Sequence, residues 1–144
     1  MKDRVIFCDK LTKNFGETIA LNETSIELFT GEILAILGPS GCGKSTLLRA
    51  IAGFENIDLG DITINGETVS SKDTFIPAEK RRVGMVFQDY ALFPHLTVED
   101  NVAFAAATRS KSTKEALVLQ MLKLVGLEGM EQRYPHELSG GQQQ

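Results

Sequence analysis

The chain has 144 residues, of which 42% are hydrophobic and 24% charged, so it is not a disordered segment and is long enough for one domain with a core, or for a piece of a larger domain. Its net charge of −4 argues against nucleic acid or an anionic lipid surface as the main partner. No apolar run is long enough to span a membrane, no apolar signal core opens the chain, and two isolated cysteines form no metal or redox motif, so we expect a cytoplasmic protein.

The first 37 residues carry β signals. Residues 5–8, 18–21 and 25–29 are short strand candidates, and in the third apolar and polar residues alternate. Asn22 and the Thr30-Gly31 pair are turn residues that punctuate them. Residues 33–37 are apolar throughout, which is typical of a strand buried inside a parallel sheet. We therefore predict an antiparallel β layer that leads into a parallel-sheet strand.

A glycine-rich loop follows, and then a helical pattern over residues 44–52 with Gly53 as its C-terminal cap. The spacing of Gly38, four residues, and Gly43-Lys44-Ser45 is the phosphate-binding P-loop pattern, in the strand and helix context that it requires. Glycines without a Cβ can adopt positive φ and turn successive N–H groups toward an anion. The expected phosphate-binding residues are Ser40, Gly41, Cys42, Gly43, Lys44, Ser45 and Thr46.

We expect a separate role for each of three side chains in and next to this loop. Lys44 brings positive charge to the outer phosphates, next to the positive end of a helix dipole. Ser45 offers a hydroxyl to Mg²⁺, a cation that takes oxygen ligands. Cys42 stands where the pattern leaves the residue free, so it is interpreted as a space-filling thiol, with sensitivity to oxidation as the alternative. The alternative for the whole stretch is a glycine-rich turn with a solvated lysine.

Residues 61–64 and 67–69 flank Asn65-Gly66, a pair that favours the type I′ turn of a hairpin. A polar loop over residues 70–78 follows, and we interpret the basic cluster at residues 80–82 as a short solvated patch. Residues 83–87 form a second predicted buried strand. It ends at Gln88, a polar residue at the sheet edge where α/β proteins bind ligands.

From residue 89 the pattern becomes helical, so we divide the chain into a β and P-loop part, residues 1–88, and a helical part, residues 89–144. A capping box at residues 97–100 opens a helix to about residue 106, and a second helix over residues 112–125 ends at Gly126. Residues 133–137 are irregular, and Ser139 is placed to cap a final helix. The apolar stripe of the second helix consists of Leu117, Met121, Leu122, Leu124 and Val125.

Four features in this order resemble the ATP-binding subunits of ABC transporters. They are Phe15, the P-loop, Gln88 in Val86-Phe87-Gln88-Asp89, and the run Leu138-Ser139-Gly140-Gly141-Gln142, which is similar to the family's signature. The resemblance covers essentially the whole chain. It implies an α/β P-loop NTPase of the ABC type, with an N-terminal antiparallel β subdomain and the start of a helical subdomain. It also implies ATP and Mg²⁺ as cofactors and a transport-coupled ATPase activity.

The resemblance assigns a role to each matching position. Phe15 is similar to the aromatic residue that stacks on adenine, and an ordinary core phenylalanine is the alternative. Gln88 is similar to the residue that reaches Mg²⁺ and the attacking water, and a surface glutamine is the alternative. A second phosphate-binding turn is implied at Ser139, Gly140, Gly141 and Gln142. In the family this turn faces the nucleotide of the other subunit, so the resemblance implies a head-to-tail homodimer.

The resemblance also implies partners. Residues 88–98, with Tyr90, Leu92 and Phe93, resemble the region that receives a membrane-spanning permease, and packing beneath the helical part is the alternative. Residues 81–98 are most similar to bacterial importers of the ferric iron, polyamine and sulfate group, which work with a periplasmic solute-binding protein. Ferric iron, another small ion or a polyamine is the implied solute. The implied location is the inner face of the cell membrane, with no nucleic acid partner.

The family's Walker B aspartate, catalytic glutamate and switch histidine follow the signature, and this sequence contains no match to them. His95 and His136 precede the signature and are interpreted as loop histidines. We therefore expect an N-terminal portion of a longer ATPase, without the C-terminal core strands, that binds ATP and by itself hydrolyses it weakly or not at all. The alternatives are a nucleotide-binding or regulatory module that does not hydrolyse ATP, and a soluble ABC protein outside transport.

Overall fold

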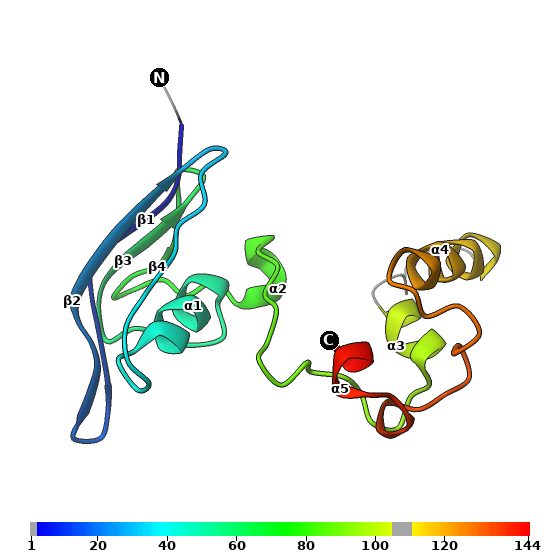
Figure 1. The fold of residues 1–144 in the computed structure, drawn as a ribbon. Helices are drawn as coiled ribbons and strands as arrows, with labels where there is room; N and C mark the ends of the chain where they lie inside the picture. The colour runs from blue at the N-terminus through cyan, green and yellow to red at the C-terminus, as the bar shows by residue number, and fades with distance from the viewer. Residues whose placement is uncertain (1–2, 105–110) are drawn as a thin grey trace. The chain divides into compact units, whose positions relative to one another are not determined.

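The computed structural model describes residues 3–104 and 111–144, and Figure 1 shows the path of the chain. The chain forms two compact units, Met1–Met85 and Val86–Gln144. The first contains a β-sheet and short helices, and the second is built from helices and loops. Within the described part of the chain, no helix combines the length and the apolar character that a membrane crossing requires. The division into functional parts after residue 88 stays a prediction.

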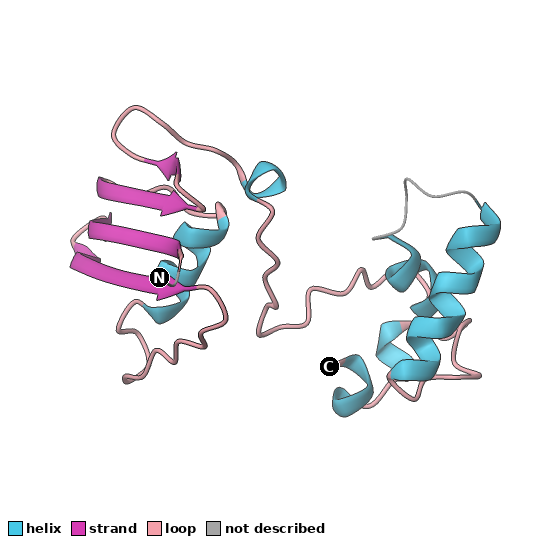
Figure 2. Ribbon diagram, turned by 90° about the horizontal axis from the view of Figure 1, so that it is seen from above, coloured by secondary structure: helices cyan, strands magenta, loops and turns pink. Residues whose placement is uncertain are grey.

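The first unit contains a β-sheet whose strands lie side by side (Figure 2). The sheet is four-stranded and antiparallel, with strand order β2-β1-β3-β4. Its strands are β1 Arg4–Phe15, β2 Thr18–Phe29, β3 Leu59–Ile64 and β4 Glu67–Ser70. The predicted antiparallel layer is confirmed. The predicted hairpin is confirmed as well, because Asn65 and Gly66 have φ of 50° and 81°, the two positive values that a type I′ turn requires.

Strands β1 and β2 are longer than the sequence predicts. Asn22, which we expected in a turn, lies inside β2, so that prediction is wrong. The pairing register shifts between Cys8 and Leu11 and again between Leu11 and Lys13, and Glu23 has a positive φ of 45°. Bulges of this kind bend a strand without ending it, which lets a long strand include residues that are usually found in turns.

Residues 33–37 and 83–87, which we predicted as buried strands, are not strands in the structure. Ile33 is 98% exposed and Val86 is 97% exposed, while Ile36 and Val83 are half-buried against the core of the first unit. Neither segment pairs with a strand among the described residues. An apolar run predicts that a segment is buried. A strand also needs a neighbouring strand to pair with, and the apolar run does not specify one.

Helix α1, Lys44–Ala52, forms where the sequence predicts it. Gly53 caps it with φ of 88°, and its N–H donates to the carbonyls of Arg49 and Ala50. The buried face of α1 joins the sheet in one hydrophobic core. The buried residues of this core are Cys8, Leu11, Leu21, Leu47, Ala50, Ile51, Ile57, Ile62, Ile64 and Val69.

Arg81 corrects our interpretation of the basic cluster as solvated. It ends helix α2, Ala78–Arg81, and is only 5% exposed, whereas Lys80 and Arg82 are exposed. Burial lowers the pKa of Arg81. Its guanidinium donates to four carbonyl oxygens, which belong to Ala50 at 2.7 Å, Ile51 at 3.1 Å, Val69 at 3.1 Å and Ile76. The last carbonyls of a helix lack their usual intrahelical donors, and Arg81 supplies a donor to Ile51 and a second donor, beside the Gly53 N–H, to Ala50. Its bond to Val69 ties α1 to β4.

The second unit consists of α3 Val98–Phe104, α4 Lys111–Leu124, the 3-10 helix η1 Pro135–Glu137 and α5 Gly140–Gln143. Thr97 caps α3 as predicted, since the Asp100 N–H donates to Thr97 Oγ1 at 3.2 Å, but the Asp100 carboxylate accepts from the Thr97 hydroxyl at 3.1 Å and not from its N–H, so the box is only half formed. Our expected end of that helix near residue 106 lies outside the described residues. The stripe on α4 is partly wrong, because Val118 and Leu122 are buried while Leu124 is 77% exposed. The core of this unit is Val98, Ala103, Val118, Leu122 and Leu138.

The environment of Arg81 predicts that Arg81→Met lowers the free energy of unfolding by about 3 kcal/mol, because buried carbonyls lose charged donors that nothing replaces. Lys80→Met is the matched control, since it makes the same kind of change at the neighbouring, exposed residue of α2, and we expect a change below about 0.5 kcal/mol. Urea denaturation followed by circular dichroism measures both. Equal effects of the two substitutions would contradict the assignment of Arg81 as a buried anchor.

Candidate functional site

The glycine-rich loop at residues 38–43 leads directly into α1 (Figure 1). Gly41 and Gly43 have φ of 82° and 90°, as the pattern predicts. The N–H of Leu47 donates to the carbonyl of Gly43 at 2.9 Å and makes the first bond of the helix ladder. The N–H groups of residues 44–46 precede that bond and point out of the helix end. The loop and helix therefore present backbone donors and the positive end of the helix dipole to one place.

Gly43 lies against strand β2. A Cβ at this position would stand 2.1 Å from the Ala20 carbonyl oxygen and 3.3 Å from Leu21 Cδ2. Gly41 shares the positive φ, but a Cβ there would meet nothing within 4 Å. Gly43 thus has two reasons to be glycine, its conformation and its close approach to the sheet, whereas Gly41 has only the first.

Lys44 folds back over its own loop. Its Nζ donates to the carbonyls of Gly38 at 2.8 Å and Pro39 at 2.6 Å, and lies 3.5 Å from the Cys42 sulfur. The ammonium therefore stands beside the loop that carries the backbone donors, and the loop carbonyls balance its charge. Cys42 is a free, exposed thiol, and a Cβ on Gly38 would stand 2.7 Å from its sulfur.

Ser45 is exposed in the first turn of α1, Thr46 is half-buried and Ser40 is exposed in the loop. No group of three or more histidine, cysteine or carboxylate side chains that could hold a metal occurs among the residues that the structure describes. A metal at this loop would thus depend on the Ser45 hydroxyl and on oxygens of the bound ligand. That donor set suits Mg²⁺, which keeps several waters and binds through few protein oxygens together with phosphates.

Phe15 ends β1 and is 49% exposed. It belongs to neither core, so the alternative of an ordinary core phenylalanine does not fit the structure. The Nζ of Lys13 lies 5.1 Å from the centroid of its ring, within the range of a cation–π interaction. The stacking role that the resemblance assigns to this ring stays a prediction.

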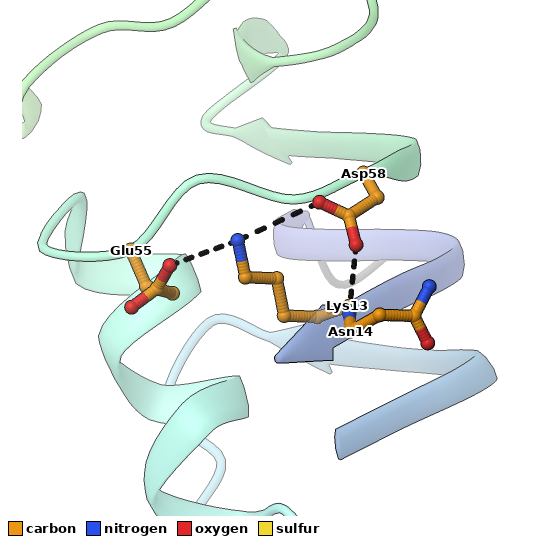
Figure 3. A network of polar contacts seen from close by, with 4 residues as sticks. All are labelled: Lys13, Asn14, Glu55 and Asp58. Atoms are coloured by element: carbon orange, nitrogen blue, oxygen red, sulfur yellow. Dashed lines mark hydrogen bonds and ion pairs between the residues drawn. The ribbon is translucent and has the colours of Figure 1, made fainter. Parts of the chain in front are cut away.

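A polar network that the sequence did not indicate surrounds this strand end (Figure 3). Lys13 Nζ lies 3.0 Å from Glu55 Oε1 and 3.5 Å from Asp58 Oδ1, and the Asn14 N–H donates to Asp58 Oδ2 at 2.7 Å. Burial lowers the pKa of Lys13, but the hydrogen bond and charge of Glu55, followed by those of Asp58, outweigh it, so the pKa is raised. Lysines and carboxylates are usually solvated, and Lys13 is far from Glu55 and Asp58 in the sequence. The sequence therefore contains no local signal that predicts this network.

Gln88 belongs to the second unit, while the P-loop belongs to the first. It is exposed and begins a turn over residues 88–91. The following loop is fastened by Asn101, whose side chain accepts from the Phe93 N–H at 2.9 Å and donates to three loop carbonyls. The ring of Phe93 also packs on Phe104, with centroids 4.7 Å apart, whereas Tyr90 is 41% exposed. Phe93 itself is 36% exposed, so both expectations for this loop, packing and contact with a partner, stay predictions. The sequence did not indicate the role of Asn101.

The run at residues 138–142 forms the predicted cap of α5. The Ser139 N–H donates to Gln142 Oε1 at 3.0 Å and the Gln142 N–H donates to Ser139 Oγ at 3.4 Å, a reciprocal capping box. Gly140 and Gly141 are exposed and have open space where a Cβ would lie. His136 is exposed and stacks on Tyr134 with ring centroids 5.8 Å apart, but it lies in η1, so the expectation of a histidine in an irregular loop is wrong.

Comparisons with known proteins place this geometry in a family. The model of the family described as ABC transporter matches residues 21–144. The sulfate/thiosulfate import ATP-binding protein CysA of Mycobacterium bovis is 50% identical over 135 residues, which are 92% of this chain and 37% of that protein. The spermidine/putrescine import ATP-binding protein PotA of Vibrio vulnificus is 49% identical over 142 residues, which are 97% of this chain and 37% of that protein.

A bacterial ABC transporter cassette has been solved as a dimer, and this chain matches it with a TM-score of 0.82 and 32% identity. A post-hydrolysis dimer of the same cassette, bound to ADP and Pi, matches with a TM-score of 0.80 and 31% identity. Each match covers 96% of this chain and 65% of the other. The chain thus spans 37% of the length of the two curated relatives above and about two thirds of the solved cassette.

The contrast between the two loop glycines gives a prediction. Gly41→Ala should lower the free energy of unfolding by about 1–2 kcal/mol, the cost of a positive φ in a residue with a Cβ. Gly43→Ala adds the clash with the Ala20 carbonyl and should cost about 3–5 kcal/mol. Chemical denaturation of both variants beside the unchanged chain tests this. Equal losses would show that the close contact with β2 does not constrain Gly43.

Proposed function

The chain belongs to the ABC transporter ATP-binding family, and from this membership we propose that it is the ATP-binding part of a bacterial membrane importer. One observation carries the proposal, the loop at residues 38–43 in which positive-φ glycines, Lys44 and the N-terminus of α1 converge. Such a loop binds the phosphates of a nucleotide. The signature-like run at residues 138–142 in the same chain supports ATP as the nucleotide of an ABC-type ATPase.

We propose the following roles in ATP binding. The backbone N–H groups of residues 40–46 hold the phosphate oxygens, for which the Cys42 N–H gives up its 3.4 Å bond to the Pro39 carbonyl. Lys44 exchanges its loop carbonyls for the outer phosphates. Phe15 stacks on adenine with its exposed ring. Ser45 and Gln88 are the proposed protein ligands of Mg²⁺, which when bound neutralises charge that develops on the transferred phosphoryl group.

We also propose partners. Ser139, Gly140, Gly141 and Gln142 face the nucleotide of a second subunit in a head-to-tail homodimer. The dimeric cassette among the solved relatives supports a dimer. Residues 88–98 contact a membrane-spanning permease, and exposed Tyr90 is available for that contact. A periplasmic solute-binding protein takes part indirectly, and the chain acts at the cytoplasmic face of the membrane.

The imported solute is proposed only by class. The relatives described above are named for the import of sulfate/thiosulfate and of spermidine/putrescine. These names support a small ion or a polyamine as the solute. Ferric iron, which we expected from the sequence, is one member of that class and has no support from them.

Lys44→Ala tests the proposed phosphate contact. Removing a cation that pairs with phosphate should weaken ATP binding about 10- to 100-fold. Lys72→Ala, at an exposed lysine in the loop after β4, is the matched control and should leave the affinity within about twofold. Isothermal titration calorimetry with Mg-ATP measures both affinities. Unchanged ATP binding by Lys44→Ala would contradict nucleotide binding at this loop.

Steady-state ATPase assays separate an ATPase from a module that only binds nucleotide. We expect the 144-residue chain to bind ATP but to turn it over far more slowly than a typical enzyme, because no residue of this sequence matches the family's catalytic glutamate. The Lys44→Ala variant gives the background rate. Turnover at ordinary enzyme rates that depends on Lys44 would contradict this expectation.

A further inference from the structure

The end of β1 has a neighbouring strand on one side only, and on the other side a single residue, Asp58, holds it. On one side, residues 13–15 pair with β2, where Phe15 faces Thr18. On the other side, the pairing of β1 with β3 ends at Thr12 and Leu59. Beyond that point Asp58 continues the edge, because its N–H donates to the Thr12 carbonyl at 2.9 Å and its carboxylate accepts from the Asn14 N–H at 2.7 Å. The strand end that carries Phe15 thus depends on Asp58.

Lys13 connects this strand end to α1. Its side chain is only 13% exposed, and its ammonium bridges Asp58 at 3.5 Å and Glu55 at 3.0 Å (Figure 3). The N–H of Glu55 donates to the carbonyl of Arg49 in the last turn of α1 at 3.3 Å. The ion pairs therefore link the strand that ends in Phe15 to the helix that begins at the P-loop. Because the cation is mostly buried and has two acidic partners, its position is much better defined than that of a surface lysine.

Lys13 also lies over Phe15. The 5.1 Å distance from its Nζ to the ring centroid places the cation over one face of the ring, and 49% of Phe15 stays exposed. A ring fixed by a cation on one face can present its other face to a flat, apolar group such as a nucleotide base.

We propose that Lys13, held by Glu55 and Asp58, is a positioning residue that fixes the Phe15 ring relative to the P-loop and thereby supports recognition of the nucleotide base. This inference rests on the proposed function. Lys13 acts through Phe15, so it contributes to the affinity for the base and not to the affinity for the phosphates.

Two ligands separate these contributions. Mg-ATP carries both base and phosphates, whereas inorganic tripolyphosphate with Mg²⁺ carries only phosphates. Isothermal titration calorimetry on the 144-residue chain should show that Lys13→Met weakens ATP binding about fivefold and leaves tripolyphosphate binding within about twofold. Lys13→Arg keeps the charge and should retain most of the affinity for ATP. Lys10→Met, at an exposed lysine of the same strand, is the matched control and should bind both ligands normally.

A double-substitution cycle tests whether Lys13 works through Phe15. Phe15→Ala should weaken ATP binding about tenfold, and adding Lys13→Met to it should cause no further loss. Normal binding of tripolyphosphate by each variant shows that the P-loop is still folded. Independent losses in the cycle, equal losses for the two ligands, or unchanged ATP binding by Lys13→Met would each overturn the positioning role. If the unsubstituted chain binds neither ligand, the proposed function fails together with this inference.

Discussion

The contact between Gly43 and the Ala20 carbonyl is the constraint on which the candidate site depends. It leaves no room for a side chain, so the last residue of the loop lies directly on strand β2. Helix α1 begins one residue later, and its N-terminus is therefore fixed to the sheet by backbone rather than by flexible side chains. A phosphate-binding loop needs its donors in place before the ligand arrives, because ordering them afterward would cost conformational entropy.

Charged side chains hold the other end of α1. Arg81 satisfies two of its last carbonyls from within the core, and the Glu55 N–H bonds to a third. Neither charge is left unpaired, since the guanidinium has four carbonyl acceptors and Glu55 faces Lys13. A charged side chain with a full set of partners can orient the helix end at a modest cost in desolvation free energy, whereas a buried charge without partners would destabilise the fold. The helix is thus tied to the sheet at both ends by groups of different kinds.

The sequence predicts those features whose signals are local. The Asn65-Gly66 turn, the Gly53 cap, the Thr97 cap and the Ser139 cap each depend on a few adjacent residues, and all four are present. The strands expected at residues 33–37 and 83–87 are absent, because a strand also needs a partner that its own sequence does not specify. For the same reason the buried state of Arg81 was missed: its four acceptors come from elements that only the fold brings together.

The two sides of the candidate site differ in the same way, because one depends on adjacent residues and the other on residues that are distant in the sequence. Its phosphate-binding side consists of contiguous residues that act mainly through backbone groups, so a spacing pattern is sufficient to find it. Its proposed base-binding side has one exposed ring whose surroundings include Glu55 and Asp58, which lie 40 and 43 positions away along the chain. No local pattern encodes such a pairing, because a solvated lysine and a partly buried, paired one have the same sequence signature. Motifs are therefore sufficient to propose where the phosphates bind, and the contacts that would set how the base is held become visible only in the folded chain.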